Sequence, residues 1–167
     1  LRRPGAYAAI RRAVAVCIGR RDFRIVHVSI QSNHLHLLVE ADTKRALANG
    51  VRAFMISATQ HLNGLSGRRG NVFPRRYHAV QLTTPKQVRA ALCYVLNNWR
   101  RHREDRQAPA QVDRYSTGIL FDGWAGVTKP FPIPAGYEPL PVSGAKTWLL
   151  TTGWREHHPL IGLGETP

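Results

Sequence analysis

Two adjoining segments of alternating character, together spanning residues 23–40, constrain the fold of this chain more than any other feature. In the first, "FRIVHVSIQ" (23–31), side chains at every second position form two separate sets, as expected for the two faces of a strand, which predicts a strand. Its expected faces are Val26, Val28 and Ile30 on one side and Phe23, Ile25, His27 and Ser29 on the other. Ser32 and Asn33 then provide turn chemistry before the run "HLHLLVE". The pattern therefore predicts an antiparallel hairpin.

The second strand carries two histidines one residue apart. Side chains of a strand alternate between its faces, so His34 and His36 share one face with Leu38 and Glu40. The spacing aims both imidazoles at the same place. Alone, the pair has a simpler interpretation as two polar residues on the solvent side of a half-buried strand.

The remaining pattern indicates a mixed α+β fold. Helices are expected from Pro4 to about Gly19, from Thr43 to about Leu62, and after the helix-start signal formed by Thr84, Pro85 and Gln87. "RYHAVQL" (76–82) alternates and predicts a third strand. This order favours an antiparallel sheet with helices packed on one face. Adding one strand at the front would make it ferredoxin-like, and the first residue, Leu1, suggests that residues have been lost upstream.

Length and composition favour one domain with a tail. We expect one catalytic or binding domain over residues 1–118 and a Pro/Gly-rich extension over residues 119–167, where segments such as "KPFPIPAGYEPLP" occur. Cys17 and Cys93 stand far apart, which supports neither a disulfide framework nor a cysteine zinc site and favours a reducing cytoplasm. No run approaches the roughly 20 apolar residues of a membrane-spanning helix.

The charge of the chain points to a polyanionic partner. Lys and Arg number 24 against 10 Asp and Glu, a formal net charge of +14, which favours nucleic acid. The candidate phosphate-binding residues are Arg68, Arg69, Arg75 and Arg76 around a glycine-rich loop, and Arg100, Arg101 and Arg103 towards the end of the last predicted helix segment. Ordinary solvated clusters of arginine are the alternative.

The last helix adds two chemically active groups. Its apolar stripe comprises Val88, Leu92, Val95, Leu96 and Trp99. Tyr94 and Asn98 lie four residues apart on the flank of that stripe and can reach a common point. Two imidazoles and a carboxamide oxygen suit Mg²⁺ or Mn²⁺, and a nearby phenol could attack a phosphodiester to form a phosphotyrosine. Asn98 as a surface residue, and Tyr77 or Tyr115 as the nucleophile, are the alternatives.

These segments resemble a known family. "NHLHLLVE" resembles the HUH motif (His, bulky apolar residue, His), and "YVLNNWRRHR" resembles the tyrosine helix of REP-associated tyrosine transposases, single-tyrosine HUH transposases of insertion-sequence type. The similarity covers about residues 5–124, including "GNVFPRRYHAVQLTTPKQVRAALCYVLNNWRRH". It implies a ferredoxin-like nuclease that recognises imperfect hairpins in single-stranded DNA and cuts beside them with Tyr94. His34, His36 and Asn98 would then surround a divalent cation.

The resemblance also implies DNA transposition and recombination in a bacterial cytoplasm, in association with the nucleoid. The chain departs from the family in two ways, because the first, central strand is missing and Trp99 stands where members often have proline. Two other functions stay open: a non-catalytic domain that binds nucleic-acid hairpins, and a metal-dependent RNase or phosphoesterase with a water nucleophile. Monomer and homodimer are both compatible with the sequence.

Overall fold

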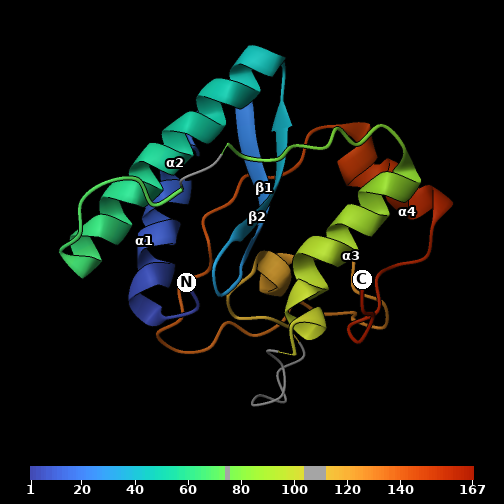
Figure 1. The fold of residues 1–167 in the computed structure, drawn as a ribbon. Coiled ribbons are helices and arrows are strands. Elements are labelled where there is room, and N and C mark those ends of the chain that lie inside the picture. The colour runs from blue at the N-terminus through green and yellow to red at the C-terminus, as the bar shows by residue number, and fades with distance from the viewer. Residues whose placement is uncertain (74–75, 104–111) are drawn as a thin grey trace.

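The computed structural model describes residues 1–73, 76–103 and 112–167 (Figure 1). Its elements are, in chain order, α1 (Pro4–Ala15), β1 (Phe23–Ile30), β2 (Leu35–Ala41), α2 (Lys44–Ser66), α3 (Pro85–Arg101), the 3₁₀ turn η1 (Thr117–Leu120), the π-helical turn η2 (Leu149–Gly153) and α4 (Trp154–His157). The α+β class and the predicted hairpin are confirmed. Thr84 caps α3 in a capping box with Gln87, as expected.

A β-bulge changes the faces predicted for the first strand. β1 and β2 pair antiparallel, with Ser29 opposite His36, but the register shifts between Ile25 and His27. The extra residue at the bulge, Val26, breaks the two-residue period. Phe23 and Ile25 therefore join Val28 and Ile30 on one face, contrary to strict alternation, and all four are buried in one core cluster.

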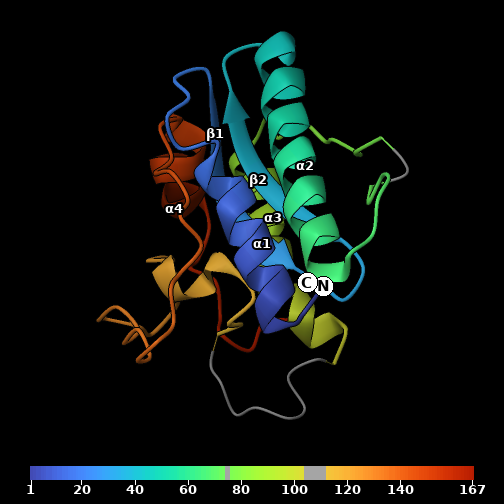
Figure 2. The ribbon, with the colours of Figure 1, turned by 90° about the vertical axis from the view of Figure 1, so that its left-hand side faces the viewer.

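Helices α1 and α2 cover that face of the sheet, as Figures 1 and 2 show. Ile10 and Val14 of α1 and Phe54 and Ala58 of α2 are fully or nearly fully buried there. Gly50 allows close contact between α2 and β1, because a Cβ at this position would lie 2.2 Å from the Phe23 ring. Burial of this apolar face fixes the hairpin against the two helices.

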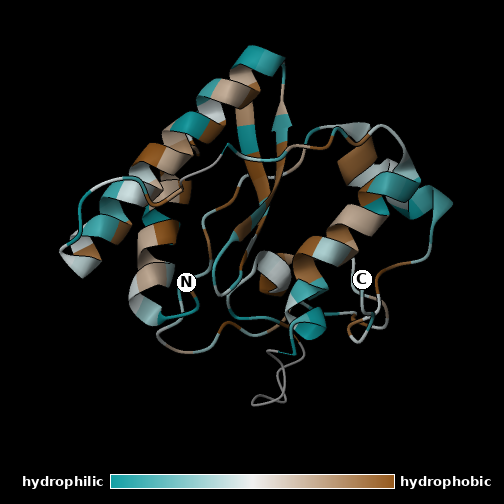
Figure 3. Cartoon of the chain, in the orientation of Figure 1, coloured by the Kyte–Doolittle hydropathy of each residue, from teal (hydrophilic) through white to brown (hydrophobic). Residues whose placement is uncertain are grey.

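Helix α3 packs on the opposite face, so the prediction of helices on one face is wrong. Leu38 of β2 is buried with Leu92 and Leu96 of α3 in a second cluster that also contains Trp154 and Ile161. The reason is that β2 carries apolar side chains on both faces, with Leu35 and Leu37 packed against the first cluster. Figure 3 shows hydrophobic residues on the sides of α2 and α3 that face the sheet.

The predicted third strand is also wrong. The structure gives residues 76–82 no strand, and all of them are exposed except Leu82, which is half-buried. A strand needs the edge of a neighbour, and the second edge of β1 is already covered. There Ile30 donates its backbone N–H to the Tyr115 carbonyl at 2.8 Å, and Ser143 donates to the Ile25 carbonyl at 2.9 Å. Alternation by itself does not produce a strand, because the segment must also pair with a neighbour, and residues 76–82 pair with neither β1 nor β2.

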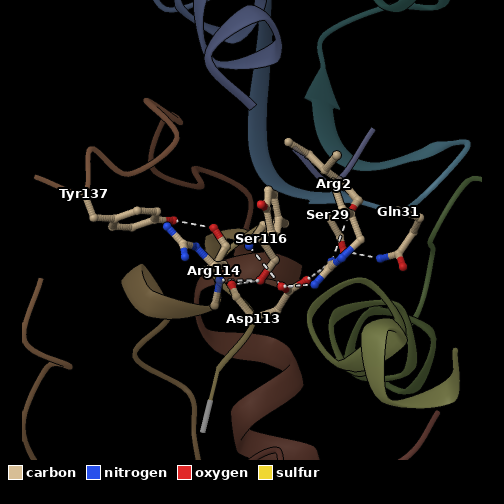
Figure 4. Close-up of polar contacts among 10 residues, drawn as sticks. Arg2, Ser29, Gln31, Asp113, Arg114, Ser116 and Tyr137 are labelled. Carbon is tan, nitrogen blue, oxygen red and sulfur yellow. Dashed lines mark hydrogen bonds and ion pairs between the residues drawn. The ribbon is translucent and has the colours of Figure 1, made fainter. Parts of the chain in front are cut away.

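Residues after 118 contribute to both clusters. Trp124, Leu140, Trp154 and Ile161 are each at most 1% exposed. The preceding segment is fixed by the buried ion pair between Arg2 and Asp113, at 2.8 Å, which Figure 4 shows beside Ser29 and Gln31. Tyr137 donates a hydrogen bond to the Arg114 carbonyl in the same view. The division at residue 118 stays a prediction, although both sides of it share buried contacts.

A buried carboxylate fixes the turn before η2 to the sheet. Glu40 is 5% exposed and accepts hydrogen bonds from Arg24 Nε at 3.1 Å and from Thr147 N and Oγ1 at 2.8 and 2.7 Å. Burial acts to raise the pKa of Glu40, but the hydrogen bonds from Thr147, Lys146 and Arg24 outweigh it and lower the pKa. The charged carboxylate therefore stabilises the folded state.

We expect Glu40→Gln to lower the free energy of unfolding at pH 7 by about 1.5–3 kcal/mol, because a charge-assisted network is lost. A depressed pKa means that this stability is present above the ordinary carboxyl value of 4.5 and is lost as pH falls through the lower folded value. Urea unfolding of both proteins should therefore converge in acid. Glu138→Gln is the control, since this side chain is 71% exposed and should change stability little. A pH-independent difference would contradict the prediction.

Candidate catalytic site

The two predicted histidines face one another at the start of β2. The Nε2 atoms of His34 and His36 lie 3.0 Å apart, and their ring centroids lie 4.7 Å apart. The position follows from the hairpin, because the turn at residues 31–34 ends with Gln31 donating its backbone N–H to the His34 carbonyl. The strand period thus brings both rings to one point, as the sequence predicted.

Asn33 sets the tautomer of the first histidine. Its Oδ1 lies 2.7 Å from His34 Nδ1, and with the amide in this orientation the oxygen accepts from Nδ1–H. Nε2 of His34 then presents a lone pair towards His36. A ligating histidine is commonly oriented in this way by a carbonyl on its other nitrogen. The sequence indicated Asn33 only as a turn residue, so this role was missed.

The second histidine is neutral at pH 7. Burial, together with repulsion from the neighbouring His34 and His102, lowers the pKa of His36 to about 4. Asn98, on α3, is fully buried and places Nδ2 3.0 Å from His36 Nε2. Its Oδ1 is buried without a hydrogen-bond partner among the described residues. Oxygen and nitrogen of an amide exchange places on rotation by 180°, which would direct the oxygen at the imidazoles.

These groups fit a divalent cation. Two ligands about 2.1 Å from one octahedral ion and at right angles are about 3.0 Å apart, which equals the spacing of the two Nε2 atoms. Among the residues that the structure describes, no three His, Cys, Asp or Glu side chains form a ligand group. The third protein ligand would therefore be the Asn98 amide, whose buried oxygen has no partner in the described chain.

Tyr94 contacts the same cluster from α3. Its ring lies edge-on to that of His36, with centroids 4.9 Å apart and an angle of 74°, and the residue is 37% exposed. Tyr94 and Asn98 of this helix and His102, its C-cap, follow one another at intervals of four. The His102 ring lies 5.9 Å from that of His34. The interval of four signalled His102, which the sequence analysis did not select.

The competing tyrosines lie elsewhere. Tyr115 packs against Tyr7, with ring centroids 5.9 Å apart, and lies under the Arg2 guanidinium at 4.6 Å. Tyr77 lines a groove on α2. Of the three candidates, Tyr94 is the one with a ring contact to the histidine pair among the described residues.

The two groups of predicted phosphate-binding arginines are separated by the sheet. Arg100 and Arg101 form the end of α3, Arg103 lies just beyond it, and Arg100 stacks over Trp99 at 4.7 Å. Arg68 and Arg69 lie in the loop after α2, which packs on the other face (Figure 1). Arg76 lines the groove on α2, and Arg75 lies outside the described residues. The structure therefore brings the first group, and not the second, close to the imidazoles.

Comparison with protein families, curated proteins and solved structures gives no significant match. Within the described ranges, no helix combines the length and apolar character needed to cross a membrane. Support for a function therefore comes from the geometry of the site and from the sequence resemblance.

Proposed function

We propose that this protein is a metal-dependent, single-stranded DNA endonuclease and strand transferase of the single-tyrosine HUH type, acting beside DNA hairpins. One observation carries the proposal: two imidazoles, a buried carboxamide and a phenol meet, although His36 and Asn98 are 62 residues apart in the chain. We also propose that the fold derives from a ferredoxin-like sheet, and that the protein acts on DNA in a bacterial cytoplasm.

The chemistry assigns one role to each group. The Tyr94 oxygen attacks phosphorus and gives its proton to water, the bond from phosphorus to the 3′ oxygen breaks, and that oxygen takes a proton from water. The products are a 5′-phosphotyrosine and a free 3′ hydroxyl. His34, His36 and Asn98 would hold Mg²⁺ or Mn²⁺, which when bound polarises the phosphodiester and offsets its charge.

Strand transfer follows from the covalent intermediate. The phosphotyrosine conserves the phosphodiester bond, so attack by another 3′ hydroxyl rejoins DNA without a nucleotide cofactor. Arg100, Arg101 and Arg103, at or just beyond the end of α3, would contact backbone phosphates near the cut. We propose this arginine group as the one that positions the strand.

The direct test is formation of a covalent adduct. The protein is incubated with Mn²⁺ and a pool of DNA imperfect hairpins that have randomised single-stranded arms and a label at the 3′ end. We expect a labelled band that survives SDS and is lost on protease treatment, whereas EDTA abolishes the band and leaves most binding intact. Unchanged cleavage after complete chelation would rule out a catalytic role for the divalent cation.

A second candidate function is supported by the two-stranded sheet. If residues 76–82 stay unpaired in solution as they are in the structure, the protein could act as a hairpin-binding module without catalysis. It would then show salt-sensitive binding and no SDS-resistant band. A water nucleophile, the third possibility, predicts cleavage without any adduct.

A further inference from the structure

A groove lies on the outer flank of α2, away from the catalytic site. Its volume is about 620 Å³, within the range of about 300–1,000 Å³ typical of ligand sites. The large apolar lining residues are Met55, Ile56, Phe73 and Tyr77, and the basic ones are Arg52 and Arg76. The groove thus combines aromatic surface with two guanidinium groups.

Two of these apolar side chains, Ile56 and Tyr77, lie outside the core, whereas Met55 and Phe73 are partly buried against the first core cluster. Ile56 is 48% exposed and Tyr77 is 43% exposed, whereas Phe54 and Ala58 of the same helix are buried against α1 and the sheet. Residues 52, 55, 56 and 59 form one stripe on α2 at helical spacing, and all four line the groove. Exposed apolar surface that is bordered by charge is typical of an interaction site.

Charge selects the class of ligand. Arg52 and Arg76 line the groove, and Arg68 and Arg69 lie in the loop that contributes Asn71 and Phe73 to its lining. An aromatic ring beside arginine is the combination that binds unpaired nucleotides, because a base stacks on the ring while the guanidinium contacts the phosphate. The polar side chain of Gln60, also in the lining, can hydrogen-bond to a base edge.

We propose that this groove binds an unpaired nucleotide of single-stranded DNA, with its base stacked on Tyr77 and its phosphate held by Arg52 and Arg76. The choice of single-stranded DNA as the ligand rests on the proposed function, but binding in the groove requires neither Tyr94 nor a cation. It would hold the strand on the face of the sheet opposite the catalytic site, and so would determine which single-stranded arm of a hairpin is retained.

The test is fluorescence anisotropy with a labelled oligo-dT of ten nucleotides and with the same oligonucleotide containing abasic positions. Both measurements are made in EDTA, so that cleavage does not interfere. We expect Tyr77→Ala to bind oligo-dT about five- to a hundredfold more weakly, the range that loss of one base stack gives. Tyr77→Phe should bind as the wild type does. Abasic DNA should bind weakly to the wild type and no more weakly to Tyr77→Ala.

The arginines have their own matched control. Arg52→Gln and Arg76→Gln should each reduce the slope of log affinity against log salt by about 0.7, the value for one phosphate contact on a single strand. Arg12→Gln, which removes an exposed arginine from α1, carries the same change in charge and should leave the slope nearly unchanged.

Three results would overturn the groove proposal. They are unaltered oligo-dT affinity in Tyr77→Ala, equal wild-type affinity for abasic and intact strands, and a change of oligomeric state in Tyr77→Ala without loss of DNA binding, which would make the groove a contact between copies. Failure of the proposed function appears separately, as absence of the SDS-resistant adduct in the wild type.

Discussion

Replacing Tyr94 by phenylalanine is expected to abolish the covalent protein–DNA adduct and to leave hairpin binding within about twofold of the wild type. The variant lacks only the oxygen that would attack phosphorus. The amount of adduct formed should therefore fall by on the order of 10³-fold or more, as for loss of other catalytic nucleophiles. The Tyr94 ring, which lies 4.9 Å from that of His36, is retained. Adduct is measured by SDS gel and binding by anisotropy on the same hairpin pool.

Tyr115→Phe is the matched control. Tyr115 packs against Tyr7 and Arg2 rather than against the histidines, so its variant should form adduct at the wild-type rate. Undiminished adduct in Tyr94→Phe would remove Tyr94 from the mechanism. Cleavage that persists without adduct would favour the water nucleophile.

The site illustrates what local spacing can predict. A strand period of two placed His34 and His36 together, and a helix period of four placed Tyr94 and Asn98 on one flank of α3; the structure has both arrangements. That the strand and the helix meet does not follow from either period, since the segments are about 60 residues apart. The resemblance supplied that expectation, and the Asn98 contact with His36 is consistent with it.

Other features depended on tertiary context. The bulge at Val26 reassigned the faces of β1, and no composition signal distinguishes it from regular alternation. Residues 76–82 have a strand pattern, but residues 115–117 and 143, from the distant C-terminal part, cover the edge of β1. Strand pairing is a property of the assembled fold and not of the local pattern, and residues 76–82 pair with neither strand of the sheet.

The Pro/Gly-rich segment was the least predictable part of the chain. Low periodicity suggested an extension on the surface of the domain, yet isolated aromatic and apolar residues in it are buried. Trp154 is fully buried, stacks on Phe121 with ring centroids 5.9 Å apart, and donates Nε1–H to the Leu150 carbonyl at 3.2 Å. Single large side chains can complete a core without a periodic segment around them, because burial requires only that each reaches a vacant position.

Trp154→Ala should therefore lower the free energy of unfolding by about 3–5 kcal/mol, the usual cost of removing a large buried aromatic side chain. This is a large share of the roughly 5–15 kcal/mol that stabilises an ordinary domain, so urea unfolding should shift strongly. Trp148→Ala is the matched control from the same segment, since Trp148 is 52% exposed and its loss should cost far less. Equal, small effects of both substitutions would show that residues 119–167 lie outside the cooperative unit. The predicted division at residue 118 would then be supported, because a tail that contributes nothing to the free energy of unfolding is not part of the core.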